Sequence, residues 1–421
     1  MGTHRWAGAR RRLVGACAVI LTIGIVTGCA SQGARWQSGP PSPTPGASSL
    51  TVTPAADAKD VSPADPVKAE IAFGHLDTVT LTNPQGKVVK GDFNADKSAW
   101  TNSEALGYNK TYKLVASGVG DDGQRHEQTL SFTTVKPKNL TLPYLRANLF
   151  TLLDKKTYGV GQPIVVWFDE PITDKAAAQR TLTVTTDPPV DGAWHWFDNR
   201  ELHWRPQSYW TPGTKVTVDA KVYGRNLGNG LYGQEDVTAS FTIAPHARML
   251  VVDAATQRMK IYIDGQQLTT VAGKDISNGF PIATGKSQVE NGVDFRTYSG
   301  VHVMMEKHDV KQMKSCNPDG TGICDPTSSN YYVSDIKLAI RISNSGEFVH
   351  LRDWYVSSMG GPNHRSHGCV NVGTPYINWI YENFGSGDIV NVLNTGKTLS
   401  VRDGLGDWIM PWDEWVKGSA L

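Results

Sequence analysis

The chain has 421 residues, which is enough for two to four domains that each bury a core of their own. Its 41 basic and 40 acidic residues give a net charge of +1, so the composition offers no electrostatic case for nucleic-acid binding. The 42 glycines, 23 prolines, 13 tryptophans and 14 tyrosines favour turn-rich β structure and argue against a long helical bundle.

The first 28 residues are typical of an export signal. Three arginines at positions 10–12 precede an apolar run over residues 13–28, which is too short and one-sided for a transmembrane helix. Residues 26–29 (Val-Thr-Gly-Cys) resemble the bacterial lipobox, in which the cysteine is lipidated and becomes the new N-terminus. We therefore expect a lipoprotein signal peptide over 1–28, a lipidated Cys29, and an exported chain anchored to the outer face of the cell membrane. The alternative is an ordinary signal peptide with an incidental cysteine.

A flexible tether and two β modules are expected to follow the signal. Residues 29–50 are rich in Ser, Pro, Gly and Ala, which predicts a disordered tether. Segments 51–137 and 138–246 share one pattern, in which Trp100 and Trp204 are each followed seven residues later by a turn and a strand. Short alternating strands between Pro, Gly, Asn and Asp turns, in units of about 100 residues, predict two immunoglobulin-like β-sandwich domains.

Two groups of tryptophans allow two interpretations. Their rings would stack on sugars if they were exposed, or fill cores and interdomain contacts if they were buried. We expect packing for both groups, and the helical spacing of the C-terminal group supports this. The first group is Trp194, Trp196 and Trp210, and the second is Trp408, Trp412 and Trp415 in the C-terminal segment 396–421.

The sequence pattern of residues 247–395 is typical of another β-rich domain. Segments 249–253 and 259–263 are predicted to form a β-hairpin. Residues 304–333 contain few apolar side chains and many Gly, Asn, Asp and Ser, so we expect one long loop there. A loop of this length in a compact domain is usually a lid or a disordered segment.

Three cysteines lie beyond the N-terminal region. Cys316 and Cys324 frame a turn-forming loop that is able to close under a disulfide; the alternative is two unpaired thiols. No CxxC or HExxH spacing supports a metal site, so we expect none. Cys369 is then the odd cysteine, and an unpaired thiol in an exported protein is a candidate for a reactive group.

The surroundings of Cys369 indicate acyl transfer through a thioester. The cysteine lies in residues 366–371 (Ser-His-Gly-Cys-Val-Asn), nineteen residues after His350. A thiol nucleophile needs a base, and His350 serves if the chain folds back beside Cys369. Gly368 permits a tight backbone turn, which allows neighbouring amides to face a developing oxyanion.

These segments resemble the signature of the L,D-transpeptidases, the cysteine enzymes that cross-link peptidoglycan, and most closely that of the multidomain mycobacterial members. The match includes the His350–Cys369 motif, Met313 where those enzymes carry a donor-pocket methionine, and Tyr332 where they carry a lid tyrosine. Residues 403–415 match their C-terminal subdomain. The resemblance implies a mostly-β chain: two immunoglobulin-like sandwiches, a β-rich catalytic domain over 247–395, and a short Trp-rich C-terminal subdomain over 396–421.

The resemblance also implies roles for the side chains. Cys369 is expected as nucleophile and His350 as base, with the amides near His367 and Gly368 in the oxyanion hole. Leu351 stands where the family often has serine, although its carbonyl is still able to orient the histidine ring. The remaining expected roles are substrate contacts for Tyr332 and Met313, loop support for Ser366, and a substrate contact or a loop brace for Asn371.

Two arginines near the motif, Arg352 and Arg365, are candidates for binding the carboxylate of a diaminopimelate side chain. Guanidinium groups match carboxylates in bidentate fashion. We nevertheless favour solvated loop arginines as the interpretation of both.

The expected reaction forms 3→3 cross-links between diaminopimelate residues, with release of D-Ala and without any cofactor. The expected partners are peptidoglycan stem peptides, the membrane through the N-terminal lipid, and carbapenem inhibitors. The same acyl-enzyme would give an L,D-carboxypeptidase if water were the acceptor, or would attach proteins to the wall if a protein amine were. A non-catalytic wall-binding scaffold is the alternative from another class.

Overall fold

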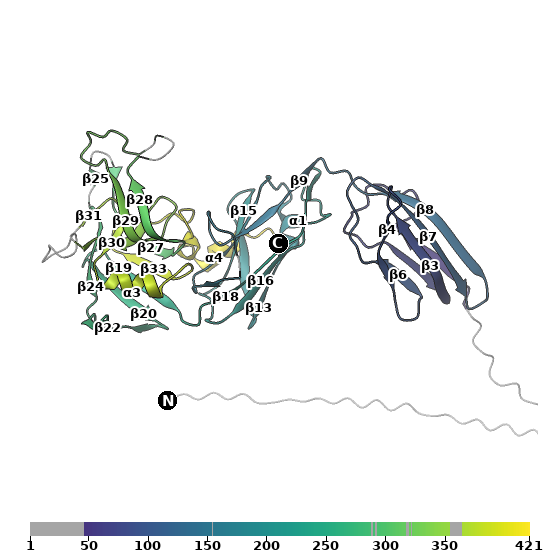
Figure 1. The fold of residues 1–421 in the computed structure, drawn as a ribbon, viewed down its shortest axis with the longest axis horizontal. Helices are drawn as coiled ribbons and strands as arrows, with labels where there is room; N and C mark the ends of the chain where they lie inside the picture. The colour runs from purple at the N-terminus through teal and green to yellow at the C-terminus, as the bar shows by residue number, and fades with distance from the viewer. Residues whose placement is uncertain are drawn as a thin grey trace, which may run out of the picture. The chain divides into compact units, whose positions relative to one another are not determined.

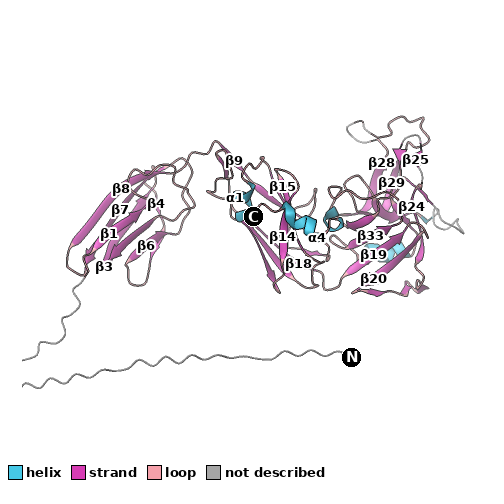
Figure 2. Ribbon diagram, turned by 180° about the vertical axis from the view of Figure 1, so that it is seen from behind, coloured by secondary structure: helices cyan, strands magenta, loops and turns pink. Residues whose placement is uncertain are grey.

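The structure is a computed structural model that describes residues 46–153, 155–287, 289–290, 293–316, 320, 322–353 and 364–421. The expected signal peptide, Cys29 and most of the expected tether lie outside the described residues. Residues Ala47–Leu421 form one compact unit made mostly of β-strands (Figures 1 and 2). None of the helices within the described ranges is long and apolar enough to cross a membrane.

The first sandwich consists of two four-stranded sheets, in the orders β1-β2-β6-β5 and β4-β3-β7-β8. Alternating burial along β7 shows why its sequence forms a half-buried strand. Trp100 and the stacked rings of Tyr112 and Phe132 fill the core, where no cysteine pair is present to do so. The strands are β1 (Ser49–Thr53), β2 (Lys68–Ala72), β3 (Gly74–Thr82), β4 (Val88–Val89), β5 (Gly91–Phe93), β6 (Ala99–Asn102), β7 (Thr111–Gly120) and β8 (Arg125–Thr133).

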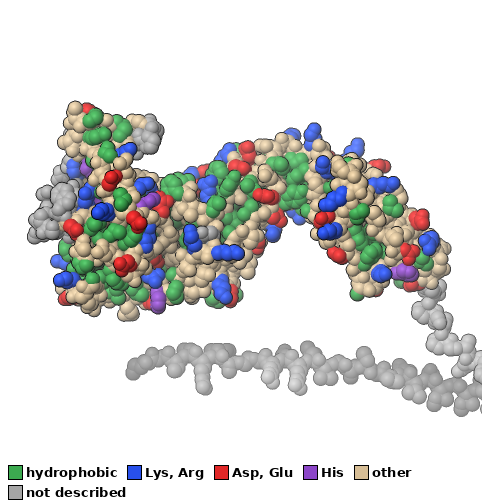
Figure 3. All heavy atoms as spheres, in the orientation of Figure 1, with side chains coloured by type: hydrophobic (Ala, Val, Ile, Leu, Met, Phe, Trp, Pro, Cys, Tyr) green, Lys and Arg blue, Asp and Glu red, His purple; other side chains and the backbone are tan. Residues whose placement is uncertain are grey.

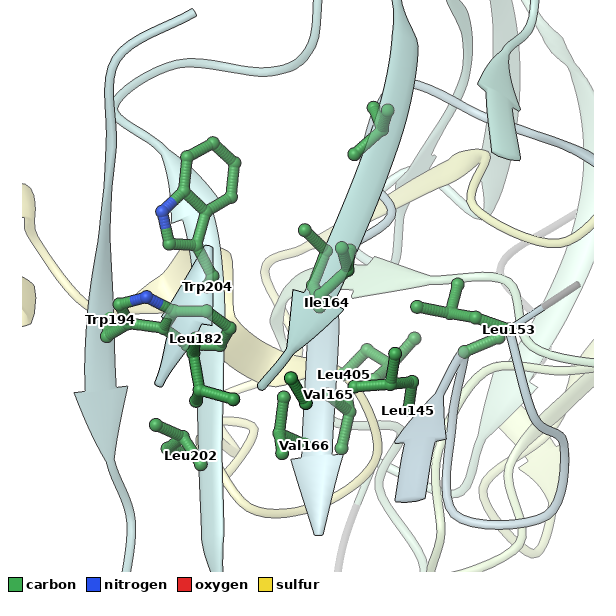
Figure 4. Close-up of a cluster of buried hydrophobic side chains, with 14 of the residues drawn as sticks. Leu145, Leu153, Ile164, Val165, Val166, Leu182, Trp194, Leu202, Trp204 and Leu405 are labelled. Carbon is green, nitrogen blue, oxygen red and sulfur yellow. The ribbon is translucent and has the colours of Figure 1, made fainter. Parts of the chain in front are cut away.

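The second sandwich has sheet orders β10-β12-β15-β14 and β11-β18-β16-β13, and β9 pairs separately with β17. Figure 4 shows its buried side chains, among which Leu405 of the C-terminal segment also lies. Trp194, Trp196 and Trp210 are all buried, as the packing interpretation requires. The elements are β9 (Asn139–Thr141), β10 (Pro143–Arg146), β11 (Thr157–Tyr158), β12 (Ile164–Phe168), α1 (Lys175–Arg180), β13 (Leu182–Asp187), β14 (Gly192–Trp196), β15 (Glu201–Pro206), β16 (Lys215–Ala220), β17 (Leu231–Gly233) and β18 (Val237–Ile243).

The third β region is built on one large sheet, with the order β27-β33-β19-β20-β24-β32-β30-β29-β28. Its core includes Leu250, Ile261, Val349, Val370 and Val392, all fully buried. The elements are β19 (Arg248–Asp253), β20 (Arg258–Ile263), β21 (Gln266–Gln267), β22 (Thr270–Val271), β23 (Lys274–Asp275), β24 (Phe280–Gly285), β25 (Val289–Glu290), β26 (Val293–Asp294), β27 (Gly300–Val303), β28 (Lys307–Lys314), β29 (Val333–Arg341), β30 (Phe348–Leu351), β31 (His364–Ser366), β32 (Val370–Val372), α3 (Tyr376–Asn383) and β33 (Ile389–Leu393).

The prediction of one long loop over 304–333 is wrong for its first half. Strand β28 pairs in antiparallel fashion with β29, from Lys307 opposite Ile340 to Lys314 opposite Val333. Most side chains of β28 are at least partly exposed, so the strand is held by its backbone ladder and needs few apolar residues. The sequence therefore did not predict β28, because the strand lacks the alternation of apolar residues by which strands are recognised.

The C-terminal segment packs on the second sandwich through η1 (Gly406–Ile409), α4 (Trp412–Trp415) and η2 (Val416–Gly418). The indole Nε1 of Trp408 donates to the Gly161 carbonyl at 2.7 Å, and that of Trp415 donates to the Ala193 carbonyl at 2.9 Å. The Arg205 guanidinium lies 4.5 Å from the centre of the Trp415 ring. Packing is thus the role of this aromatic group.

The surface carries both signs of charge. On the face shown in Figure 3, basic and acidic side chains are interspersed and no large patch of one sign stands out. This distribution agrees with the balanced composition of the chain.

Candidate active site

Neighbouring parallel strands bring the predicted base and nucleophile together. β30 pairs with β32 so that Val349 lies opposite Val370 and His350 opposite Asn371. Both valines are fully buried, which fixes this register because a slip by one residue would expose them. Cys369 directly precedes β32, and His350 and Cys369 line one cavity of about 540 Å³. Strand pairing therefore brings His350 and Cys369, which are nineteen residues apart in the sequence, to the same cavity.

The orientation of His350 leaves one ring nitrogen as a proton acceptor. Its Nδ1 lies 3.1 Å from the carbonyl oxygen of Leu351. A carbonyl only accepts, so Nδ1 carries the proton and Nε2 does not. Burial lowers the pKa of His350 to about 4, so the ring is neutral at physiological pH. The main-chain carbonyl at Leu351 thus holds the tautomer that a general base requires.

Cys369 is protonated at rest. Burial raises the pKa of its thiol to about 12, and a backbone hydrogen bond from Phe348 acts in the opposite direction. Among the described residues no hydrogen bond joins Sγ to the His350 ring; Sγ lies 3.9 Å from the carbonyl oxygen of Gly346. The resting pair is therefore a neutral thiol and a neutral imidazole.

The loop that carries Cys369 is held by two hydroxyl groups. Ser366 Oγ donates to the Cys369 carbonyl at 2.5 Å and accepts from the Gly368 amide at 3.2 Å. Thr297 Oγ1 donates to the Gly368 carbonyl at 2.7 Å and accepts from the Gly285 amide at 2.9 Å. The loop-support role predicted for Ser366 matches this geometry, whereas Thr297 was not predicted.

Gly368 has a conformational role in this loop. Its φ of 129° lies in a region that side chains rarely adopt, and a Cβ there would come within 3.3 Å of Glu347 Oε1. Its amide donates to Ser366 Oγ at 3.2 Å, and its predicted place in an oxyanion hole stays a prediction. The Cys369 amide has no hydrogen-bond partner among the described residues and remains available to an oxyanion.

His367 contributes its ring to packing around this loop. The ring centre lies 4.7 Å from that of Phe295 and 4.8 Å from that of Tyr332. This contact links the cysteine loop to the β28–β29 hairpin. The ring's expected role in orienting the loop is consistent with these contacts.

Met313 and Tyr332 reach the same cavity from the β28–β29 hairpin. Met313 is on β28 and Tyr332 immediately precedes β29, and both pack in a small cluster with Phe348 and Cys369. Burial raises the pKa of Tyr332 to about 12, so its hydroxyl stays protonated and is able to donate. Both residues line the cavity that also contains Cys369, and their substrate contacts stay a prediction.

A disulfide closes the loop next to Tyr332. Cys316 and Cys324 are joined, which leaves Cys369 as the free cysteine of the described residues. Ser315 connects this loop to the tyrosine, because its Oγ donates to the Ile323 carbonyl at 2.8 Å and accepts from the Tyr332 amide at 3.0 Å.

Asn371 and Arg352 also border the cavity. Asn371 is buried and its Nδ2 donates to the Ala283 carbonyl on β24 at 3.2 Å, which favours the bracing role. The Arg352 guanidinium donates to Ser334 Oγ at 2.9 Å. The side chain of Arg365 lies outside the described residues.

Glu347 is a further buried residue that the sequence did not single out. Its Oε1 accepts from the Tyr298 amide at 3.0 Å, beneath Gly368, and Oε2 has no partner among the described residues. Burial raises the pKa of this carboxyl to about 8. Across the described ranges, no group of three or more His, Cys, Asp and Glu side chains is arranged to hold a metal ion.

Two family descriptions match the chain: the L,D-transpeptidase catalytic domain over residues 247–392 and the bacterial Ig domain over residues 58–226. L,D-transpeptidase 2 of Mycobacterium tuberculosis is 38% identical over 84% of this chain and 81% of that protein. L,D-transpeptidase 5 of the same species is 36% identical over 96% of this chain and 83% of that protein. A solved L,D-transpeptidase in complex with imipenem aligns with a TM-score of 0.45 at 24% identity, covering 60% of this chain and 99% of that chain.

Proposed function

This chain belongs to the L,D-transpeptidase family, and from that premise we propose that it forms 3→3 cross-links in peptidoglycan through a thioester on Cys369. The observation that carries the proposal is the cavity shared by Cys369 and a neutral His350 whose Nε2 carries no proton. Tyr332 and Met313 border the same cavity and supply a polar and an apolar contact for a peptide.

In the first step Sγ of Cys369 attacks the carbonyl carbon between diaminopimelate and D-Ala of a tetrapeptide stem. The thiol proton passes to Nε2 of His350, and the oxyanion accepts hydrogen bonds from the Cys369 amide and the Tyr332 hydroxyl. The C–N bond then breaks, Nε2 returns the proton to the amine of D-Ala, and the thioester remains.

In the second step the side-chain amine of diaminopimelate on a neighbouring stem attacks the thioester. Nε2 accepts a proton from that amine and passes it to the departing sulfur, which restores the thiol. The product is an amide between two diaminopimelate residues. The bonds and protons of the two steps balance with the enzyme, the donor and the acceptor alone.

The test is product mass with a purified disaccharide-tetrapeptide as both donor and acceptor. The expected product is a dimer lighter than two donors by one D-Ala, and it should be absent with Cys369→Ala. Serine would leave a weak nucleophile in place, so alanine is the cleaner variant. Release of tripeptide without any dimer would overturn the cross-linking reaction and favour water as the acceptor.

The proposal includes export and a lipid anchor at Cys29. Its support is the arginine cluster, the apolar run and the lipobox-like residues 26–29. It also includes acylation of Cys369 by carbapenems, because the strained amide of a β-lactam presents the same reacting carbonyl as the stem peptide. Intact-mass measurement after imipenem treatment tests that reaction, with Cys369→Ala as control.

A further inference from the structure

Glu347 lies beneath the backbone that leads into the nucleophile. It directly precedes β30, and Gly368 directly precedes Cys369. Parallel pairing sets Val349 opposite Val370, so the same register continued back by two residues sets Glu347 opposite Gly368. The two residues are close in space, because a Cβ on Gly368 would lie 3.3 Å from Glu347 Oε1. The carboxyl therefore closes the side of this turn on which glycine has no side chain.

The same carboxyl is bonded to the segment that holds Gly368. Thr297 Oγ1 donates to the Gly368 carbonyl at 2.7 Å, and the amide of the next residue, Tyr298, donates to Glu347 Oε1 at 3.0 Å. Glu347 thus fixes the backbone from which Thr297 reaches the peptide bond between Gly368 and Cys369. The nitrogen of that peptide bond is the Cys369 amide, which is the proposed oxyanion donor.

No ion pair neutralises this carboxyl within the described part of the chain. Glu347 is 5% exposed, and its Oε2 has no hydrogen-bond partner there. Lys397 acts on the carboxyl through space, while its Nζ donates to the carbonyls of Asp294 and Arg296, both at 3.1 Å. Asp403 also acts on it, and its negative charge opposes ionisation. Burial in such surroundings favours the protonated carboxyl.

The other titratable groups around this turn are neutral or already paired. His302 Nε2 lies 2.9 Å from the Tyr298 carbonyl, and burial lowers the pKa of this histidine, so its ring is neutral. Arg341 acts on the Cys369 thiol but has an ion pair of its own. A charge on Glu347 raises the pKa of that thiol. A negative Glu347 therefore opposes the growth of negative charge on both the sulfur and the oxyanion.

We propose that Glu347 is a positioning residue for the acylation of Cys369, and that acylation requires its carboxyl in the neutral form. This inference rests on the proposed function. The neutral carboxyl holds Thr297 and Tyr298 beneath Gly368 without adding charge, whereas the anion places a like charge under the reacting groups. Because burial raises the pKa of Glu347 to about 8, the loss of acylation should occur above neutral pH.

The test is the first turnover of D-Ala release by the full chain, followed from about pH 6.5 to about pH 9.5 with the disaccharide-tetrapeptide donor. The first turnover reports acylation alone, so titration of the acceptor amine does not enter. We expect the native rate to fall about 10- to 30-fold between about pH 7 and about pH 9.5. In Glu347→Gln, which stays neutral, the rates at these two pH values should agree within about threefold.

Two further variants separate charge from loop support. Thr297→Val removes the hydroxyl that donates to Gly368 and keeps Glu347, so it should slow acylation about 2- to 10-fold at every pH and retain the alkaline fall. Lys397→Gln removes a cation that favours the Glu347 anion, so the fall should move to higher pH. Circular dichroism at each pH value measures whether the chain remains folded.

A native rate that does not fall at alkaline pH, an equal fall in Glu347→Gln, or a fall that coincides with unfolding would overturn the inference. The absence of D-Ala release by the native chain at every pH would instead overturn the proposed function. If Glu347→Gln does not fold, Lys397→Gln decides the matter, and a fall at the same pH as in the native chain would then contradict the role of Glu347.

Discussion

At the reacting cysteine, burial works against ionisation. The thiol pKa rises to about 12 and that of His350 falls to about 4, so the two groups do not form an ion pair before substrate arrives. In the proposed mechanism proton transfer is coupled to attack, and the tautomer held by the Leu351 carbonyl sets the direction of the transfer.

The pH dependence of acylation follows from these two values. Because only unprotonated His350 accepts the thiol proton, kcat/KM for D-Ala release should rise as the pH passes about 4 and be level by pH 6. The measurement is a pH profile from 3.5 to 8 with the unmodified donor. An ascending limb centred near 6.5 would contradict the neutral-pair account, since that is the pKa of an ordinary histidine.

Glu347 should make stability depend on pH. Its carboxyl keeps its proton up to about pH 8 in the folded chain but loses it near 4.5 when unfolded, so the folded state binds more protons between these values. The free energy of unfolding should therefore fall as the pH rises from 4.5 to 8, by on the order of 1–4 kcal/mol. Urea unfolding at pH 5 and 8 measures this change.

Glu347→Gln is the matched variant for that measurement, because it keeps the shape and removes the titration. The fall between pH 5 and 8 should be smaller in the variant than in the native chain. An identical pH dependence for the two chains would show that another group is responsible.

At the scale of elements, the β28–β29 hairpin carries two of the proposed substrate contacts and the disulfide loop. Ser315 joins that loop to the backbone of Tyr332 through two hydrogen bonds. The position of the tyrosine hydroxyl therefore depends on a serine that does not itself line the cavity.

Ser315→Ala should lower kcat/KM for D-Ala release by about 2- to 10-fold, because two hydrogen bonds are lost and Tyr332 is less firmly positioned. The rate of D-Ala release at matched enzyme concentration measures this effect. Ser328→Ala, in the same β28–β29 connection but outside the disulfide loop, is the control and should change the rate less. If Ser315→Ala released D-Ala at the native rate, the position of Tyr332 would not depend on the hydrogen bonds of Ser315.

The sequence predicted the catalytic pair because the spacing from His350 to Cys369 and the residues around the cysteine are local signals. It did not predict Glu347 or Thr297, whose contacts with the cysteine loop exist only after distant strands pair. The hairpin was partly missed because β28 lacks apolar alternation. The immunoglobulin-like sandwiches were predictable from their turns and alternating strands, which are again local.

At the scale of the whole molecule, the C-terminal segment is bound to the second sandwich by a buried ion pair. His203 Nδ1 lies 2.7 Å from Asp407 Oδ1, and both side chains are buried. Burial alone would lower the pKa of His203, but Asp407 and Glu201 outweigh it and raise the value to about 9. This pair stabilises the fold fully below pH 6.5, and its contribution is lost as the pH rises through 9.

Asp407→Asn should lower the free energy of unfolding by about 3 kcal/mol at pH 6, because His203 is left buried without its main partner. Arg402→Gln is the matched control, since Arg402 and Asp198 link the same two parts through an exposed pair. That change should cost less than about 1 kcal/mol. Chemical denaturation at pH 6 and 9 measures both, and equal losses in the two variants would refute a special role for the buried pair.

The central claim is that Cys369 carries the acyl group and His350 takes its proton. Intact-mass measurement of the chain after brief mixing with the tetrapeptide donor, without an efficient acceptor, tests this claim most directly. The account predicts a mass increase equal to the disaccharide-tripeptide acyl group, located on Cys369, absent in Cys369→Ala and formed at least about 100-fold more slowly in His350→Gln. Cross-linked product without this adduct, or an adduct formed at the native rate in His350→Gln, would contradict it.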